Sequence, residues 1–230
     1  FGEKVNKMLW DDYTLNPRGL LNSIWNNVPD WKEFTEVADG LWRKQIYAYS
    51  ERVVREAICN ALVHRPYTMR GDIFINMYPD RMEVVNPGSF PLGVNSSNIL
   101  HKTIQRNQHL SKIFYDLKLM EREGSGYDLM YEQQLLEGKQ LPQVEEMDDA
   151  IILTIPRKIV SPEANRLYEY IQSMYSISMK NLMALGIIIQ HKKITAIELA
   201  KMLQVPTNER LRGYVKELID NEIVMPMGAK

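Results

Sequence analysis

EAICNALVH, residues 56–64, predicts a helix that is apolar over most of its surface, since six of its nine residues are hydrophobic. The three polar residues, Glu56, Asn60 and His64, are spaced four apart, so their side chains stack along one stripe. A helix that is apolar on most sides is buried, and buried polar groups are costly unless they are paired. The stripe therefore either lines a cavity or forms a helix edge whose polar groups face water.

The residues around this stretch set its limits. Ser50 is a suitable N-cap, and Pro66 ends the helix because the residue before a proline is disfavoured in helical conformation. The pattern then changes to that of a β-hairpin, with one strand over 72–78 and a second over 81–85. Asn86-Pro87-Gly88 ends the second strand.

The rest of the first 160 residues mixes helices and strands. Residues 1–45 are polar and aromatic, and we expect helical or irregular structure there, with a short helix beginning at Pro17. A helical pattern returns around 100–119, and Gly124-Ser125-Gly126 leads into a further helix. Residues 138–149 are expected to be an acidic connector, and 151–156 a buried strand.

A linker near Ser161-Pro162 divides the chain into two expected domains, 1–160 and 161–230. In the second domain we expect a helix over 196–203, a tight turn, a helix from Asn208 to about Asn221, and a strand over 223–227. This order is typical of a winged helix-turn-helix. The expected fold class is α/β: an antiparallel or mixed sheet with helices on one face, followed by this small domain.

Composition sets wide limits on function. The net charge is -1, with 45% hydrophobic and 25% charged residues, as in ordinary globular proteins. The lone Cys59 cannot form an intramolecular disulfide, which favours the reducing cytoplasm. The longest apolar run, Ile187–Ile189, is far too short to span a membrane. The chain opens on Phe1 instead of methionine, from which we expect a missing segment upstream.

The polar stripe and the glycine turn together suggest phosphate chemistry. A helix N-terminus with small residues, such as Gly124-Ser125-Gly126, presents free backbone N–H groups to anions, although a lone Gly-x-Gly is more often a simple turn. Mg²⁺ is often held by one protein oxygen plus substrate phosphates, and the Asn60 amide suits that role. Glu56, one turn away, would orient and deprotonate a water that attacks the terminal phosphorus.

Several motifs together resemble a known family. In chain order they read REAICNALVHRPY at 55–67, PDRMEVVNPG at 79–88, Arg106-Asn107, and EREGSGY at 121–127. They are similar to the divergent ATP-binding domain labelled "putative ATP-dependent DNA helicase, RecG C-terminal", found in bacterial and archaeal transcriptional regulators. That family is similar to the GHKL ATPases, such as gyrase, histidine kinases and MutL. The resemblance covers roughly residues 15–156. It implies a GHKL-like sheet, and its members often carry an upstream AlbA-like (Schlafen-type) domain and a downstream winged helix.

The resemblance implies roles for matching residues. Glu56 and Asn60 match the water-activating base and the Mg²⁺ ligand. Asn86 and Gly88 match the box that reads adenine, and Gly124 and Gly126, flanking Ser125, match the glycine box beside the phosphates. ATP and Mg²⁺ are the implied cofactors.

One departure from the GHKL pattern bears on binding. Asn86 stands where those enzymes place an aspartate that accepts a hydrogen bond from the adenine amine. Its amide oxygen still accepts, but without charge, so we expect binding to be more secure than hydrolysis. The chain lacks the Gly-x-x-x-x-Gly-Lys-Ser/Thr loop of Walker-type motors, so the sequence argues against a helicase motor.

Two further groups have alternative interpretations. His64 either faces the phosphates or hydrogen-bonds a strand, and Arg106 either clamps phosphates or forms a surface ion pair.

In the C-terminal part, Arg210, Arg212 and Lys216 would meet DNA in a major groove. The alternative is a solvated face, because Glu209, Glu217 and Asp220 share that helix. From Ser161 onward there are nine Lys or Arg against seven Asp or Glu, so DNA binding would be weak and salt-sensitive unless a homodimer links two half-sites.

The leading hypothesis is a cytoplasmic transcriptional regulator whose GHKL-like domain binds ATP and Mg²⁺ and whose winged helix binds DNA. The alternative is a degenerate, nucleotide-free scaffold for dimerisation and protein contact. A third hypothesis is an enzyme with slow ATPase turnover.

Overall fold

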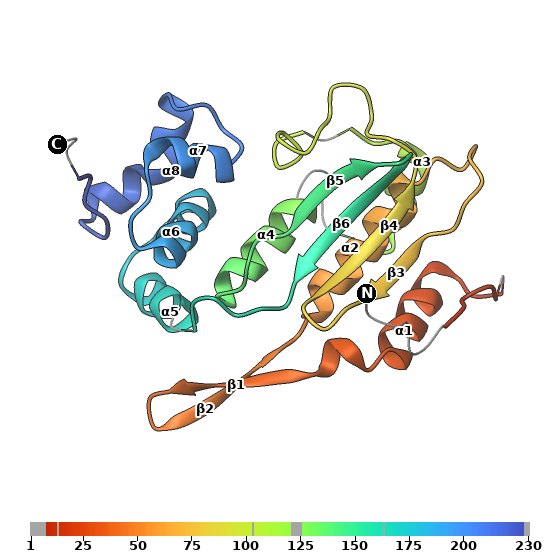
Figure 1. Cartoon of the computed structure of the whole chain (residues 1–230), viewed down its shortest axis with the longest axis horizontal. Coiled ribbons are helices and arrows are strands. Elements are labelled where there is room, and N and C mark those ends of the chain that lie inside the picture. Colours follow the sequence, from red (N-terminus) through yellow and green to blue (C-terminus); the bar gives the residue numbers. More distant parts are fainter. Residues whose placement is uncertain (1–7, 13, 103, 121–125, 163, 228–230) are drawn as a thin grey trace.

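The computed structural model describes residues 8–12, 14–102, 104–120, 126–162 and 164–227. The chain is an α/β protein whose elements follow in the order shown in Figure 1. The first part comprises α1 (Pro17–Asn27), the 3₁₀ turn η1 (Asp30–Lys32), β1 (Phe34–Asp39), β2 (Trp42–Tyr47), α2 (Glu51–His64), β3 (Phe74–Met77), β4 (Arg81–Pro87), α3 (Gln108–Asp116), α4 (Gly126–Leu136), β5 (Gln143–Met147) and β6 (Ala150–Pro156). The last part comprises α5 (Ala164–Met174), α6 (Met179–His191), α7 (Ala196–Met202) and α8 (Glu209–Asp220).

The central sheet has four strands in the order β3-β4-β6-β5, and every neighbouring pair is antiparallel. Helices α2 and α4 lie side by side behind it (Figure 1). Strand β4 alternates buried and half-buried residues, and its buried side chains are Met82, Val84 and Asn86. Since alternate residues share one face of a strand, Asn86 is directed to the same side as the core residues Met82 and Val84. The expected sheet with helices on one face is confirmed.

Helix α2 is the main support of this core. Ser50 caps it by accepting a hydrogen bond from the Val53 backbone N–H, as expected. Val53, Val54, Ala57, Cys59 and Val63 are all at most 2% exposed, and they pack with residues of the sheet and of α1. From Glu56 to His64 most of the helix surface is buried, so each polar residue in this stretch is informative.

The N-terminal region differs from expectation. Helix α1 is confirmed, but β1 and β2 form a separate two-stranded hairpin within residues that were expected to be helical or irregular. Its tip exposes Leu41 (97%) and Trp42 (79%), and Figure 1 shows the hairpin projecting from the body of the molecule. With both faces largely exposed, the hairpin lacks the apolar alternation by which a strand is recognised.

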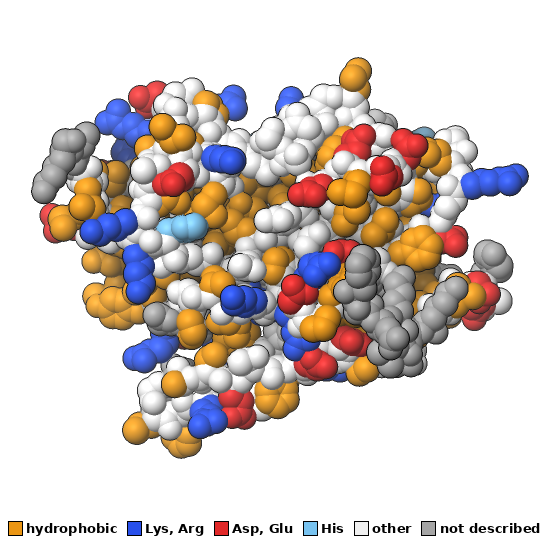
Figure 2. All heavy atoms as spheres, viewed as in Figure 1, with side chains coloured by type: hydrophobic (Ala, Val, Ile, Leu, Met, Phe, Trp, Pro, Cys, Tyr) orange, Lys and Arg blue, Asp and Glu red, His pale blue; other side chains and the backbone are white. Residues whose placement is uncertain are grey.

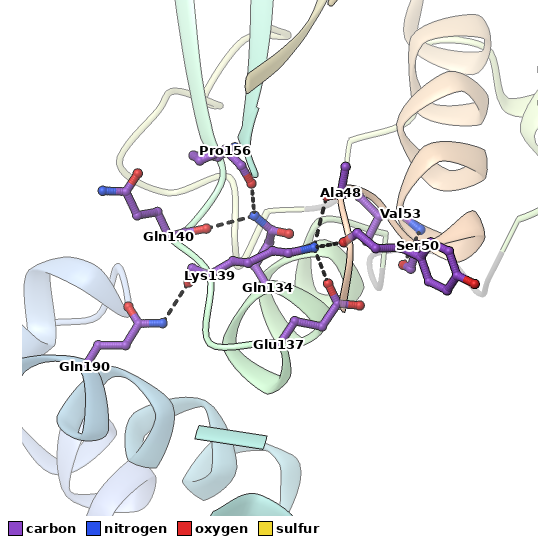
Figure 3. A network of polar contacts seen from close by, with 10 residues as sticks. Ala48, Ser50, Val53, Gln134, Glu137, Lys139, Gln140, Pro156 and Gln190 are labelled. Atoms are coloured by element: carbon purple, nitrogen blue, oxygen red, sulfur yellow. Dashed lines mark hydrogen bonds and ion pairs between the residues drawn. The ribbon is translucent and has the colours of Figure 1, made fainter. Parts of the chain in front are cut away.

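A polar junction joins this hairpin to the rest of the chain (Figure 3). The Lys139 ammonium is 1% exposed and donates to Tyr47 O (2.6 Å), Ala48 O (2.9 Å) and the Glu137 carboxylate (2.5 Å). Burial lowers the pKa of Lys139, and the neighbouring Glu137 opposes that effect. Gln190 of α6 donates to Lys139 O at 2.7 Å, so the same residue also contacts the C-terminal helices.

The C-terminal helices pack around a second core that includes Tyr168, Leu182, Leu203 and Leu218. Figure 2 shows hydrophobic side chains gathered in the hollow between these helices and the sheet. Helices α7 and α8 occupy the expected positions, and Thr195 and Glu198 form a reciprocal capping box at the start of α7.

Two assignments of single elements were wrong. Residues 223–227 form no strand, so the described C-terminal residues contain no wing, and the helix-turn-helix outline ends after α8. Strand β5 lies in the segment 138–149, which was expected to be a connector. Among the helices that the structure describes, none has the length and apolar character needed to cross a bilayer.

Candidate functional site

The α2 stripe faces α4 and a cavity. Glu56 is 1% exposed, while Asn60 and His64 are half-buried. Asn60 and His64 line the cavity together with Ala57 and Ala61 of the same helix. Of the alternatives left open by the sequence, the structure therefore favours the lined cavity over a helix edge in water.

Gly126 brings the glycine turn to this stripe. It is the first residue of α4, and a methyl group placed on it would lie 2.0 Å from Glu56 Oε1 and 2.8 Å from Asn60 Nδ2. Only glycine fits between the two helices without displacing these side chains. Gly124 and Ser125, which were expected to share the phosphate role, lie outside the described residues.

Glu56 is positioned differently from Asn60. Its carboxyl group lies against Gly126, and it is not among the described residues that line the cavity. Asn60 by contrast contributes to the lining. The arrangement places the amide at the surface of the cavity and the proposed base behind the glycine.

The remainder of the cavity is largely apolar. Its walls come from the sheet, from α4, from Met120 and from residues within 90–102 and 104–106, which follow β4. The sheet contributes Val84, Asn86, Val144, Ile151 and Leu153, and α4 contributes Gly126, Tyr127 and Met130. Such a lining suits a flat, apolar ring system with a few hydrogen-bonding groups.

Asn86 is a polar group at the sheet side of this cavity. It is 7% exposed, and its Nδ2 donates to Ala61 O at 3.0 Å. The Nδ2 group is thus used by this hydrogen bond. The amide oxygen Oδ1 is buried and has no hydrogen-bond partner among the described residues. A buried acceptor left without a partner is costly, so a ligand that donates to it would recover that cost.

Gly88 and Arg106 lie next to one another near the end of β4. Gly88 has a φ of +100°, and a Cβ there would come within 2.6 Å of Pro66, which closes α2. Arg106 donates to Ser89 O, and its Nη1 lies 3.5 Å from that same Cβ position. Gly88 is therefore required by backbone conformation and close packing, and Arg106 supports the turn while also lining the cavity.

His64 lies in the cavity wall near Arg106. Burial lowers the pKa of His64, and the positive charge of Arg106 lowers it further. The imidazole is therefore neutral at pH 7, so it acts as a hydrogen-bonding group and not as a cation. His64 thus lines the cavity, as the first of its two interpretations requires, and contact with phosphates stays a prediction.

Lys102, Gln105 and Ser111 in the cavity lining were not anticipated, nor was the supporting role of Asn107. Ser111 of α3 is 4% exposed and lines the cavity, and its hydroxyl has no hydrogen-bond partner within the described part of the chain. Asn107 donates from Nδ2 to Val63 O (2.8 Å) and Arg65 O (2.7 Å), which satisfies carbonyls at the end of α2. The position of Asn107 beside Arg106 in the motif was its only sequence signal; Ser111 had none, since it lies among the apolar residues that predicted the helix.

The residues expected to bind DNA lie elsewhere. Arg210, Arg212 and Lys216 are exposed on α8. Arg212 Nη1 lies 3.6 Å from Glu209 Oε1, so this cation is partly engaged within the helix. Among the described residues, there is no group of three or more His, Cys, Asp or Glu that would hold a metal ion.

Comparisons with known proteins bear on the first part of the chain. Residues 71–155 match the model of the family described as "Putative ATP-dependent DNA helicase recG C-terminal". This match confirms the family resemblance over β3 to β6, while α2 with Glu56 and Asn60 lies before it. A search of curated proteins gives no match.

One solved structure is similar over most of the chain. It is the crystal structure of the DIP2311 protein from Corynebacterium diphtheriae, with a TM-score of 0.71 and 22% sequence identity. The similarity covers 87% of this chain and 40% of that protein, so this chain spans less than half of its length. At this identity the likeness shows a shared fold.

Proposed function

We propose that the cavity between α2, α4 and the sheet binds an adenine nucleotide, ATP with Mg²⁺, in a regulator of transcription. The observation that carries this proposal is that Asn86 Oδ1 is buried in a largely apolar cavity without a hydrogen-bond partner among the described residues. An exocyclic amine is the donor that such an acceptor selects, and a flat purine fits the apolar walls. The ATPase-like family match to residues 71–155 supports the same ligand class.

The other end of the ligand would lie toward Gly126. The first backbone N–H groups of a helix attract phosphate, and α4 begins at Gly126, directly against Asn60. Asn60 would supply one oxygen to Mg²⁺, and the phosphates and water would supply the others. The half-buried Arg106 is a cation in the cavity wall, available to the anionic part of the ligand.

Binding is better supported than turnover. A catalytic base must reach the attacking water, directly or through one other water. Glu56 lies against Gly126 and does not line the cavity, so the described geometry supports nucleotide binding more directly than hydrolysis. Phosphate release above background that is lost in Glu56→Gln would instead establish slow hydrolysis.

Calorimetry with ATP and Mg²⁺ tests the proposal, with wild type compared with Asn60→Ala and Asn86→Ala. We expect binding by wild type and at least tenfold weaker binding by each variant, as for loss of one hydrogen bond or metal contact. ITP is the control ligand, because its base carries a 6-oxo group and has no exocyclic amine to donate to Asn86 Oδ1. No heat with wild type at millimolar ATP would overturn the proposal and favour the nucleotide-free scaffold.

DNA binding by α8 is the second part of the proposal. Arg210 and Lys216 are exposed on the helix that follows the α7–α8 turn, where a helix-turn-helix presents its groove-binding residues. Titrating duplex DNA at several salt concentrations tests it. Each of Arg210→Ala and Lys216→Ala should reduce the slope of log K against log[salt] by about one unit. Lys44→Ala, on the distant β2 strand, should leave the slope unchanged.

A further inference from the structure

Residues 90–102, here named the covering segment, contact two parts of the molecule at once. Phe90, Val94, Ile99 and Lys102 line the cavity. Leu100, between them in the sequence, is 3% exposed and belongs to the core of the C-terminal helices. Figure 1 shows the segment reaching from the end of β4 toward α7. One short stretch of chain therefore forms both a wall of the cavity and a support for the C-terminal helices.

Gln204 makes two hydrogen bonds to the backbone of this segment, here named the Gln204 clamp. It lies in the turn between α7 and α8 with a φ of +54°. Its Oε1 accepts from Leu100 N at 2.8 Å, and its Nε2 donates to Ser96 O at 3.0 Å. Both ends of one amide group are thus used on the backbone of the covering segment.

His101 adds a second set of contacts at the same turn. Its Nε2 lies 2.7 Å from Leu203 O, and its ring lies 6.3 Å from that of Tyr214 in an edge-on arrangement. Tyr214 belongs to α8, the helix that carries Arg210 and Lys216. The covering segment therefore contacts both the α7–α8 turn and α8 itself.

We propose that the covering segment couples the occupancy of the cavity to the position of α7 and α8. A ligand that enters or leaves displaces Ile99 or Lys102. These residues flank Leu100 and His101, which contact the C-terminal helices. Movement of the segment breaks the Gln204 clamp, so opening of the cavity and release of the α7–α8 turn are one event. Coupling of this kind is reciprocal: whatever holds α7 and α8 also changes the affinity of the cavity. The identity of the ligand rests on the function proposed above, but the coupling does not.

The test needs no ligand. In a Cys59→Ser background, Ala61→Cys places a thiol at a buried position of the cavity wall, and its rate of maleimide labelling measures opening of the cavity. Gln204→Ala removes the clamp. Gln190→Ala is the matched control, since Gln190 also donates an amide hydrogen bond from a C-terminal helix to the backbone of the first part, at Lys139 O. We expect at least fivefold faster labelling with Gln204→Ala, the size expected for two lost hydrogen bonds, and no comparable change with Gln190→Ala.

Cys59 in the otherwise native chain reports global unfolding, because it is fully buried and outside the cavity lining. If Gln204→Ala accelerates labelling of Ala61→Cys but not of Cys59, the opening is local and the coupling stands. Equal labelling in the Gln204 and Gln190 variants, or equal acceleration at both thiols, would overturn it.

Measurements with ATP then distinguish the proposed nucleotide site from the proposed coupling through the covering segment. If wild type binds ATP, Gln204→Ala should change the affinity at least threefold relative to Gln190→Ala, and ATP should alter amide hydrogen exchange at 199–206 in wild type. ATP binding with neither effect overturns the coupling and leaves the nucleotide site intact. If wild type binds no ATP, the proposed function fails, and the labelling rates still decide the coupling.

Discussion

Gly126 lies directly against Glu56, close enough that a methyl group on the glycine would fall 2.0 Å from the carboxylate Oε1. The same methyl group would lie 2.8 Å from Asn60 Nδ2. Two polar residues of α2 and the first residue of α4 thus share one closely packed point. Close packing of this kind keeps the Asn60 amide at the cavity surface and the Glu56 carboxylate behind it.

We expect Gly126→Ala to weaken ligand binding more than it weakens the fold. The atoms in conflict are the ends of side chains, so the helices can stay in place while Glu56 and Asn60 turn away, at a cost of roughly 1–2 kcal/mol. Urea denaturation and ATP calorimetry measure the two effects. Gly213→Ala is the control: nothing lies within 4 Å of its Cβ position on α8, and this variant should gain about 0.5–1 kcal/mol. Full ATP affinity in Gly126→Ala would show that close packing at Gly126 is not needed to position Asn60 for binding.

Ser111→Ala should raise stability and lower affinity together. The Ser111 hydroxyl is buried without a partner among the described residues, so its removal should gain about 1 kcal/mol in unfolding free energy. If the hydroxyl bonds the ligand, the same change should weaken ATP binding about fivefold or more. Ser173→Ala, on α5, is the matched control for affinity. A more stable variant with unchanged ATP affinity would show that the Ser111 hydroxyl lines the cavity without bonding the ligand.

The parts of the fold that sequence predicted are those with strong local signals. Helix α2 has a cap at Ser50, a stop at Pro66 and an apolar surface, so its limits could be predicted within a few residues. The β1–β2 hairpin has no such signal, because both of its faces are largely exposed and neither strand alternates clearly. Strand β5 pairs only with β6 at the edge of the sheet, and its Glu145 and Glu146 suit a solvent-facing edge as well as a loop.

In the candidate site, too, only the features with a local sequence signal could be predicted. The spacing of Glu56 and Asn60 predicted that they share a stripe, because helical periodicity relates residues four apart. That Glu56 lies behind Gly126 depends on the packing of α2 on α4, which no local pattern encodes. Contacts across long separations, such as Gln204 with Leu100, are determined by tertiary packing and could not be predicted from either segment alone.

Asp128 should make stability depend on pH in the mildly acidic range. Burial raises the pKa of Asp128 to about 6, and the nearby His101 partly opposes this rise. The folded pKa exceeds the unfolded value of about 3.9, so the folded state binds the proton more tightly and stability falls as pH rises from about 4 to 6. Asp128→Asn removes this loss and should be about 1 kcal/mol more stable than wild type at pH 7, a value reduced for partial exposure.

The measurement for Asp128 is urea denaturation of both proteins at pH 4.5 and pH 7. The difference between variant and wild type should be larger at pH 7. Asp116→Asn, the same chemical change at an exposed position on α3, should show no such increase. A difference for Asp128→Asn that is the same at both pH values would show that folding does not raise the pKa of Asp128.

Lys139→Met should destabilise the protein more than any exposed lysine does. The substitution keeps the volume of the side chain but leaves Tyr47 O and Ala48 O without their buried donor, and removes the partner of Glu137. Loss of one member of such a buried cluster costs about 3 kcal/mol. Lys44→Met is the control, because Lys44 is only half-buried, bonds the side chains of Asn165 and Glu169 near the surface, and its pairing with Glu169 at 3.2 Å is worth at most about 1 kcal/mol. Urea denaturation measures both variants. Equal small losses would mean that water, and not Lys139, satisfies those two carbonyls, and that the junction in Figure 3 does not hold the hairpin in place.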